Sequence, residues 1–487
     1  MQGLVLTPLW LPIMASGILF WLVVKRNRGD WCHPGRIMIG FYFLLSVASL
    51  ASDEIMTPTF KSHVTWDVMA GYTLLMCLTL MPALLIRRPD PASIAGHRFV
   101  PPVAWVLGPL VVFASVYLVP WALTSSERGF AATRQALNFT GEHVLPESIL
   151  TTLAVATAMY YEIFAILLFA LLVRRSGPLP KVIAGAGVGL AVVHSAVFSS
   201  RDGVFWATHA FLIGYWSLGA LLPRRLRRRV IVIALCSLAV GLVYIGAVTK
   251  DRFGERVGGY YSGTVGYFGM QPFVFSETVE RRFDYFGPNL RFPVVAQLMG
   301  QQESVQRTEP YEWSFGTFLT DFYAVSGWSS AIGLSLLLTG FVLAGLRFCR
   351  NKSALAYTLV VAAYTQFMVQ GVFYYRLGSA PGNYYHLSVI AIIVAIAVFA
   401  PDRKLRLREV RHTLRESLVV PSPGLLASDA GEQVWLAVQT KQVASRPSAD
   451  PLTRSGGPST ENHVCWNSGA KKGRIFRWLS GIVCPSR

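Results

Sequence analysis

Charged residues are scarce in this sequence: Asp, Glu, Lys and Arg make up 14% of its 487 residues, whereas hydrophobic residues make up 53%. This combination excludes an intrinsically disordered chain and is unusual for a soluble domain. Apolar runs of about 18 or more residues, long enough for a helix to cross a bilayer, recur through most of the sequence. The composition therefore predicts an all-α polytopic membrane protein.

Several motifs are also missing. The sequence shows no internal repeat, no zinc-ligand spacing among its histidines and cysteines, and no nucleic-acid recognition motif. The formal net charge of +18 comes mostly from short basic loops and the C-terminal tail. Such charge fixes the topology of membrane proteins and contacts anionic lipid. We therefore expect membrane lipids as partners, no nucleic acid, no metal and no cofactor.

The apolar runs predict about eleven membrane-spanning helices. The N-terminal run lacks a basic segment and a small-residue cleavage site, so we expect a retained first span and not a signal peptide. The predicted spans are 4–24, 36–51, 67–86, 101–122, 149–173, 181–199, 204–222, 228–247, 327–346, 353–372 and 385–400.

Lysine and arginine concentrate in alternate loops, and this bias sets the orientation. Eighteen positive residues fall in one set of loops, against five in the other set of short loops. We therefore expect the N-terminus outside, the C-terminus inside, and the long loop 248–315 outside. All six cysteines lie in spans, inner loops or the tail, so a disulfide framework is not expected.

The composition changes sharply after Pro401. Residues 1–400 form the predicted transmembrane domain, into which loop 248–315 is inserted. Residues 401–419 are a basic run expected to lie as an amphipathic helix on the inner surface. Residues 420–487 are rich in Ser, Pro, Gly and Thr, which is typical of a disordered cytoplasmic tail.

The loop 248–315 is far longer than an ordinary helix connection, and long loops are usually functional. It combines seven Lys or Arg and eight Asp or Glu with aromatic residues. Aromatic rings pack on the C–H faces of sugars, and charged groups bind their hydroxyls, so the loop suits a carbohydrate. The alternative is an aromatic belt at the membrane interface. The stacking candidates are Tyr260, Tyr261, Tyr285 and Trp313; the candidate phosphate or sugar contacts are Arg252, Arg256, Arg281, Arg282 and Arg291.

The stretch "FSSRDGVFW" places Arg201 and Asp202 in a short turn between two apolar runs, at the outer surface. An arginine held there is suited to bidentate binding of a phosphate or pyrophosphate. Alternatively, Asp202 caps the following helix and Arg201 reaches the lipid headgroups. The two interpretations remain equally open from these residues alone.

Further ionisable residues lie inside or beside the spans. Glu162, His194 and His209 are intramembrane, where ionisable groups indicate function unless they only pair with a neighbouring helix. Glu312 and Asp321 flank the return of the long loop to the membrane. Either acid could act as a general base at the outer surface, or could cap a helix or pair with a loop arginine.

The order of these features resembles the bacterial oligosaccharide repeat-unit polymerases, the Wzy-type O-antigen polymerases. The resemblance rests on the long outer loop, the "SRDG" turn, and the re-entry segment "FGTFLTDFYAVSGWSSAIG". Thr320, Asp321, Phe322, Tyr323 and Gly327 match the family's re-entry pattern. The resemblance covers about residues 180–400, and the earlier spans match only in hydrophobicity.

The resemblance implies a multi-pass protein of the bacterial inner membrane. Its substrate would be an oligosaccharide on undecaprenyl pyrophosphate, and its reaction metal-independent glycosyl transfer with inversion. Arginines, Arg201 first among them, would stabilise the departing pyrophosphate, and Glu312, Asp321 or Asp202 would serve catalysis. A chain-length regulator is an open candidate partner.

Two alternatives stay open. O-antigen ligases usually carry a histidine near the return to the membrane, and none stands around Phe315 and Gly316. A transporter or flippase for lipid-linked sugars would use Glu162, His194 and His209 as a proton path, and it predicts discontinuous helices and internal repeats.

Overall fold

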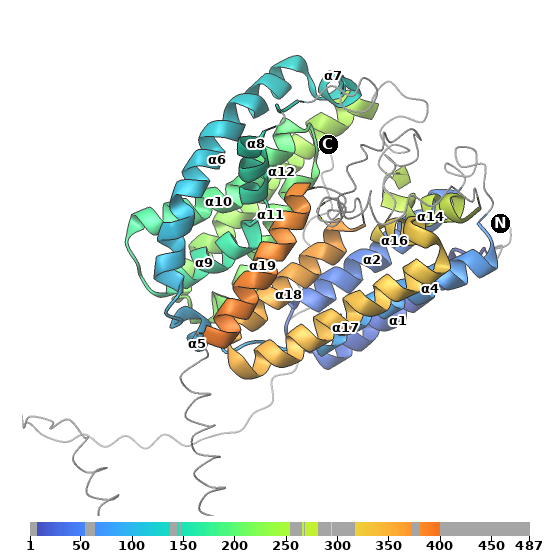
Figure 1. Cartoon of the computed structure of the whole chain (residues 1–487), viewed down its shortest axis with the longest axis horizontal. Helices are drawn as coiled ribbons and strands as arrows, with labels where there is room; N and C mark the ends of the chain where they lie inside the picture. The colour runs from blue at the N-terminus through green and yellow to red at the C-terminus, as the bar shows by residue number, and fades with distance from the viewer. Residues whose placement is uncertain are drawn as a thin grey trace, which may run out of the picture. The chain divides into compact units, whose positions relative to one another are not determined.

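Helices are the only regular elements in the described part of the chain (Figure 1). The computed structural model divides into two units, residues 1–414 and 415–487, and the second unit lies outside the described residues, as do the predicted segments 401–419 and 420–487. The structure describes residues 7–53, 64–136, 144–146, 148–253, 265–266, 268–280, 294, 317–372 and 380–399.

Every predicted span coincides with one or two helices. The corresponding helices are α1 (Trp10–Arg26), α2 (Pro34–Ala51), α4 (Trp66–Leu80) with η1 (Met81–Leu85), α6 (Val100–Arg128), α8 (Ile149–Ala158) with α9 (Tyr161–Val173), α10 (Pro178–Val197), α11 (Asp202–Leu218) with η3 (Gly219–Leu221), α12 (Arg224–Phe253), α17 (Trp328–Lys352), α18 (Ala354–Gln370) and α19 (Ala380–Phe399).

Within the described residues, eight helices are long and apolar enough to cross a membrane, or nine if the bent pair α8 and α9 is one span. Helices α1 and α18 have 17 residues each and fall just short of that length. The all-helical character is therefore confirmed for the described residues, and several helices could cross a membrane, while the count of eleven spans stays a prediction.

Two groups of helices make up the first unit. Helices α6, α8, α9, α10, α11 and α12 pack together, as do α1, α2, α4 and α17. Helix α18 contacts α2 and α17 on one side and α9 and α11 on the other, while α19 contacts α8, α17 and α18 (Figure 1). These two helices therefore join the groups, and the almost entirely buried α18 lies at the core.

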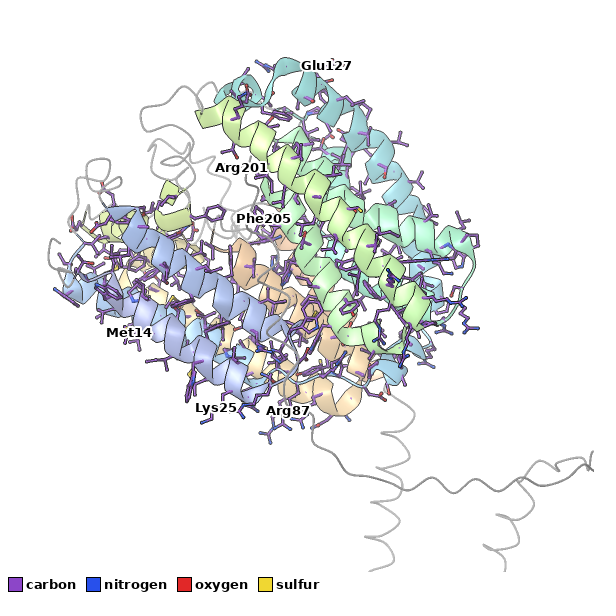
Figure 2. All side chains as sticks on the ribbon, turned by 180° about the vertical axis from the view of Figure 1, so that it is seen from behind. Met14, Lys25, Arg87, Glu127, Arg201 and Phe205 are labelled. Carbon is purple, nitrogen blue, oxygen red and sulfur yellow. The ribbon has the colours of Figure 1, made fainter. Side chains whose placement is uncertain are left out.

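The basic loops meet at one end of the helices. His33 Nε2 lies 3.3 Å from the carbonyl oxygen of Ile86, and Trp216 Nε1 donates to Asp30 Oδ2 over 2.9 Å. Arg174 Nη1 donates to the carbonyls of Ala95 and His97, both at 3.1 Å. We call this the basic end. Figure 2 shows Lys25 and Arg87 there, with Glu127 and Arg201 at the opposite end. Which side of a membrane each end faces stays a prediction.

Two features differ from the sequence expectation. The predicted span 149–173 is bent by 51° between α8 and α9. The Thr157 hydroxyl donates to the Leu153 carbonyl at 2.7 Å, and such back-bonding competes with the helical ladder and bends helices. Part of the long loop is also helical: α12 continues to Phe253, and α14 (Gln271–Glu280) is buried over its first seven residues against α4 and α16 (Phe318–Ser326).

Candidate functional site

The turn between α10 and α11 is held by its own hydrogen bonds. Asp202 Oδ1 accepts from the hydroxyls of Ser195 at 2.7 Å and Ser200 at 2.6 Å. The amide N–H of Gly203 donates to Ser195 Oγ over 2.9 Å. Ser199 adopts a φ of 48°, which lets the chain reverse within a few residues. Asp202 is therefore fixed by this turn, at the first position of α11.

Glycine is required at position 203 because two helices approach closely there. A Cβ atom on Gly203 would lie 2.3 Å from the carbonyl oxygen of Ala191 and 2.5 Å from Ser195 Cβ. Both atoms belong to α10, whose backbone cannot move away without breaking its own helix. The glycine thus allows Ser195 to reach Asp202.

Arg201 points into the protein and not toward the lipid headgroups. Its side chain is only 6% exposed, and its Nη1 donates to Thr249 Oγ1 on α12 over 2.8 Å. Tyr244, also on α12, donates its hydroxyl hydrogen to the Ser200 carbonyl at 3.0 Å. Helix α12 thereby fixes both the turn and the guanidinium. The snorkelling interpretation of Arg201 is wrong for this structure, and a preoriented cation stands at the end opposite the basic loops.

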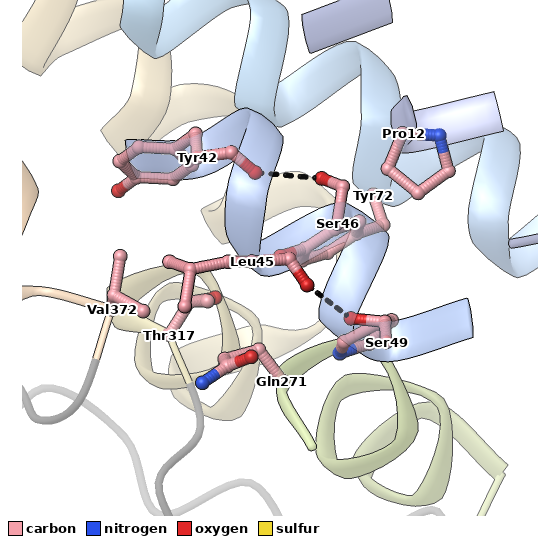
Figure 3. Close-up of a pocket in the computed structure, with 10 residues that line it drawn as sticks. Pro12, Tyr42, Leu45, Ser46, Ser49, Tyr72, Gln271, Thr317 and Val372 are labelled. Atoms are coloured by element: carbon pink, nitrogen blue, oxygen red, sulfur yellow. Dashed lines mark hydrogen bonds between the residues drawn. The ribbon is translucent and has the colours of Figure 1, made fainter. Parts of the chain in front are cut away.

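A neutral pocket lies between α1, α2, α4 and α14 (Figure 3). Its cavity volume is about 10 Å³, close to the space that one water molecule needs. None of the ten described residues that line it is charged. They are Pro12, Tyr42, Leu45, Ser46, Ser49, Tyr72, Gln271, Pro272, Thr317 and Val372.

The pocket wall is rigid on the α2 side. Tyr42 donates to the Met368 carbonyl at 2.8 Å, and the hydroxyls of Ser46 and Ser49 donate to carbonyls one turn earlier on their own helix (Figure 3). Tyr72 from α4 and Thr317, the residue before α16, also line the pocket. Phenol rings, hydroxyls and the Gln271 amide make up a polar but neutral lining.

Residues 268–271 connect the pocket to the turn at Arg201. Phe268 packs edge-on against Phe205, in the first turn of α11, with ring centroids 6.4 Å apart. Gly269 lies against α2, where a Cβ would meet Ser52 Oγ at 2.2 Å and the Ala48 carbonyl oxygen at 2.5 Å. Gln271 then lines the pocket. The buried arginine and the neutral pocket thus lie at the same end of the helices.

Asp321 lies in the first turn of α16, half-buried and four residues after Thr317 of the pocket lining. The neighbouring residues of the family-like segment are structural. Tyr323 packs edge-on against Phe275 at 5.9 Å and Trp328 at 5.4 Å. Gly327 has a φ of 78° and allows the sharp change of direction from α16 to α17. Asp321 is the one acid among the described residues of this segment.

Glu162 stands at the start of α9, immediately after the bend, and is 1% exposed. Tyr385 of α19 lies with its hydroxyl 3.2 Å from Glu162 Oε2 and also donates to Gln366 Oε1 of α18. Gln366 Nε2 donates to the Tyr161 hydroxyl at 2.6 Å, which also accepts from Gln370 Nε2. We call these five residues the Glu162 cluster. It joins three helices in the middle of the protein.

The two predicted intramembrane histidines do not join this cluster through any hydrogen bond seen in the described residues. The rings of His194 and Phe198 are tilted against each other with centroids 5.0 Å apart, and His194 lies near Asp202. His209 is 5% exposed, and neither ring nitrogen has a hydrogen-bond partner among the described residues. The structure therefore places His194 near the turn and His209 alone in the interior of α11.

Most predicted residues of the long loop lie outside the described part of the chain. Arg252 is in the last turn of α12, but its side chain is not described. The predicted residues outside the described ranges are Arg256, Tyr260, Tyr261, Arg281, Arg282, Tyr285, Arg291, Glu312 and Trp313.

Sequence reasoning missed two groups of polar residues. Tyr42, Ser46 and Ser49 recur at helical spacing along one face of α2 and mark the pocket wall. Gln366 and Gln370 are four residues apart in an otherwise apolar span, which places both amides on one face. Polar residues at such spacing inside a span are the signal that could have found both sites.

Within the described ranges, no three His, Cys, Asp or Glu side chains gather in a way that could hold a metal ion. The described site offers a buried guanidinium, nearby carboxylates and a neutral, hydroxyl-rich pocket. The chain matches no protein-family model, no curated protein and no solved structure.

Proposed function

We propose that this protein polymerises oligosaccharide repeat units carried on undecaprenyl pyrophosphate, by glycosyl transfer at the outer face of the bacterial inner membrane. The observation that carries the proposal is the buried Arg201, held at the end opposite the basic loops and connected by residues 268–271 to a neutral, hydroxyl-lined pocket. A cation for pyrophosphate and neutral hydroxyl and amide groups for sugar are the two binding elements that this reaction needs.

Arg201 would bind the pyrophosphate of the donor. Negative charge grows on the leaving pyrophosphate as its bond to the sugar breaks, and a fixed cation in a water-poor site stabilises that charge strongly. Thr249 holds one guanidinium nitrogen through its hydroxyl, so the side chain is oriented before the substrate arrives. Arginine is suited to this role because it stays charged and binds phosphate bidentately.

The acceptor needs a base. Its hydroxyl oxygen attacks the anomeric carbon, the bond to pyrophosphate breaks, and its proton passes to a carboxylate. Asp202 Oδ1 already accepts two hydroxyl groups, whereas Asp321 stands one helical turn from the pocket lining. Among the described acids we therefore favour Asp321 as the base and assign Asp202 to orienting the turn; Glu312 remains a proposed alternative base.

The test is the surface polysaccharide profile of a strain deleted for the gene and complemented with variants. We expect deletion to leave a single repeat unit on its anchor. Arg201→Ala should fail to restore the ladder of polymers, and Arg201→Lys should restore it only weakly. Arg128→Ala is the matched control, since Arg128 is an exposed arginine of α6, the helix whose C-terminus lies at the same end. Unchanged polymer length on deletion would refute the proposal.

A second candidate is transport of the lipid-linked sugar, favoured by the broken span beside a buried carboxylate. The same strains separate the candidates. Loss of a transporter leaves the lipid-linked repeat on the inner face, with no repeat unit on the anchor. If the protein were instead a ligase, the third candidate, its loss would leave finished polymer on the carrier lipid.

A further inference from the structure

Two arginines from different elements lie beside one buried tyrosine at the basic end. The backbone N–H of Arg87 donates to the Tyr357 hydroxyl over 2.8 Å, and the charged groups of Arg87 and Arg350 lie near enough to that hydroxyl to act on it electrostatically. Tyr357 of α18 is 3% exposed, whereas both arginines are exposed. We call these three residues the Tyr357 cluster. It joins the segment after η1 to the end of α17 and the first turn of α18.

The elements that carry the Tyr357 cluster are held together by a side chain. Pro82 in η1 has no N–H, so the Leu78 carbonyl oxygen lacks the helical donor four residues later, and Thr339 of α17 donates to it over 3.1 Å. Thr339 and Arg350 are eleven residues apart, which is about three helical turns, so they lie on one face of α17. Arg350 therefore stands at the end of the face that packs against α4 and η1.

The Tyr357 cluster has hydrogen-bond donors that the protein does not use. Among the described residues, no acid forms an ion pair with Arg87 or Arg350. The Tyr357 hydroxyl accepts from Arg87, and its own hydrogen has no acceptor in the described part of the chain. Guanidinium groups bind phosphate oxygens bidentately, and a phenol donates one hydrogen bond. The cluster is therefore suited to a phosphate group.

The neighbouring surface indicates that this phosphate belongs to a lipid. Met81 and Leu85 of η1, which ends just before Arg87, are exposed apolar side chains in a helix long and apolar enough to cross a membrane. Arginines at the end of such a helix lie at the level of the lipid headgroups, and basic sites between spans bind anionic headgroups. A phosphodiester bound there would place its acyl chains along the apolar side chains of η1.

We propose that Arg87, Arg350 and the Tyr357 hydroxyl bind the phosphate headgroup of an anionic phospholipid. The two guanidinium groups bind the phosphate oxygens, and the phenol donates its hydrogen to one of them. The bound lipid connects η1 to α17 and α18, the three elements that meet at the cluster. The site lies at the end opposite Arg201 and does not depend on the proposed function (Figure 2).

Native mass spectrometry of the full chain, released from detergent with added lipid, tests this inference without any assay of activity. We expect the first phosphatidylglycerol molecule to bind more tightly than phosphatidylcholine. Arg87→Gln and Arg350→Gln should each weaken phosphatidylglycerol binding about five-fold, because each removes one positive charge from the headgroup. Tyr357→Phe should weaken it about three-fold by removing a neutral donor. Arg88→Gln is the matched control, since Arg88 is also exposed but lies near Cys32, and its affinity should equal that of wild type.

Three results would overturn the inference. The first is a preference for phosphatidylglycerol that persists when Arg87 and Arg350 are both replaced by glutamine. The second is an equal loss of affinity in Arg88→Gln, which would show that net charge alone attracts the lipid. The third is displacement of the lipid by an equal concentration of inorganic phosphate, which would show that the site takes a free anion. Failure of the polymer assay would leave these affinities unaffected, so the two proposals fail independently.

Discussion

The two ends of the membrane domain use arginine differently. At the basic end, Arg174 is exposed and donates to the backbone carbonyls of two residues in a neighbouring loop. At the opposite end, Arg201 is buried and donates to a side-chain hydroxyl from another helix. The first arrangement ties loops together at the surface, and the second holds a charge inside the protein.

This difference separates exposed cations from a buried one. A surface arginine that binds carbonyls can be replaced at little cost, since water takes its place. A buried guanidinium costs free energy to desolvate, so its surroundings have to offset that cost. Substitutions at either end test whether the two ends differ in this way.

The largest effect is expected from Gly203→Ala. The added Cβ would lie 2.3 Å from the Ala191 carbonyl oxygen, and α10 and α11 would have to separate. Overpacking against backbone costs up to about 3 kcal/mol. Gly189→Ala in α10 is the control, because nothing lies within 4 Å of its added Cβ. Thermal unfolding in detergent should show a lower Tm for the first variant only; equal Tm values would contradict the close approach of the helices.

Ser195→Ala should have the next largest effect. It removes a donor to Asp202 and leaves the Gly203 N–H without its acceptor. A buried polar group left unpaired costs about 1–3 kcal/mol, and we expect about 1.5 kcal/mol here. The exposed Ser329 provides a matched serine-to-alanine control. Chemical unfolding measures both, and a loss no greater than that of the control would show that the turn does not depend on Ser195.

Arg174→Ala should cost less, below about 1 kcal/mol, because the side chain is exposed and solvent screens its charge. Polymer length in complemented cells should stay normal, in contrast to Arg201→Ala. Arg175→Ala, at the adjacent exposed arginine, controls for the change in net charge. Loss of the polymer ladder in Arg174→Ala at normal protein level would remove the distinction between the two ends.

The smallest effect is a pH dependence at the basic end. Burial lowers the pKa of His33, which precedes α2, below its ordinary value of 6.5, although the Ile86 carbonyl and Asp30 partly oppose this. Below about pH 6.5 the unfolded chain therefore takes up a proton that the folded chain resists, and stability falls as the pH falls. The Tm of His33→Gln should decrease less than that of wild type between neutral and acidic pH. Parallel Tm curves would contradict this prediction.

Much of the architecture followed from local sequence patterns. Each predicted span carries a helix because apolar length alone is enough to mark one, and the basic loops meet at one end because spans alternate in direction. The turn at Asp202 could also be predicted from the sequence. The residues that form hydrogen bonds within it, which include Ser195, Ser200 and Gly203, are at most eight positions apart. The buried α14 was not predictable in this way, because its burial depends on α4 and α16, against which it packs.

The sequence by itself determined that this is a multi-pass helical protein with a charged turn at the end opposite its basic loops. Only the tertiary structure decided that Arg201 faces inward, that α2, α4 and α14 enclose a pocket, and that Glu162 meets Tyr385 and Gln366. The physical reason is that hydropathy is a property of one segment. A hydrogen-bond partner more than 200 residues away is set by how separate helices pack.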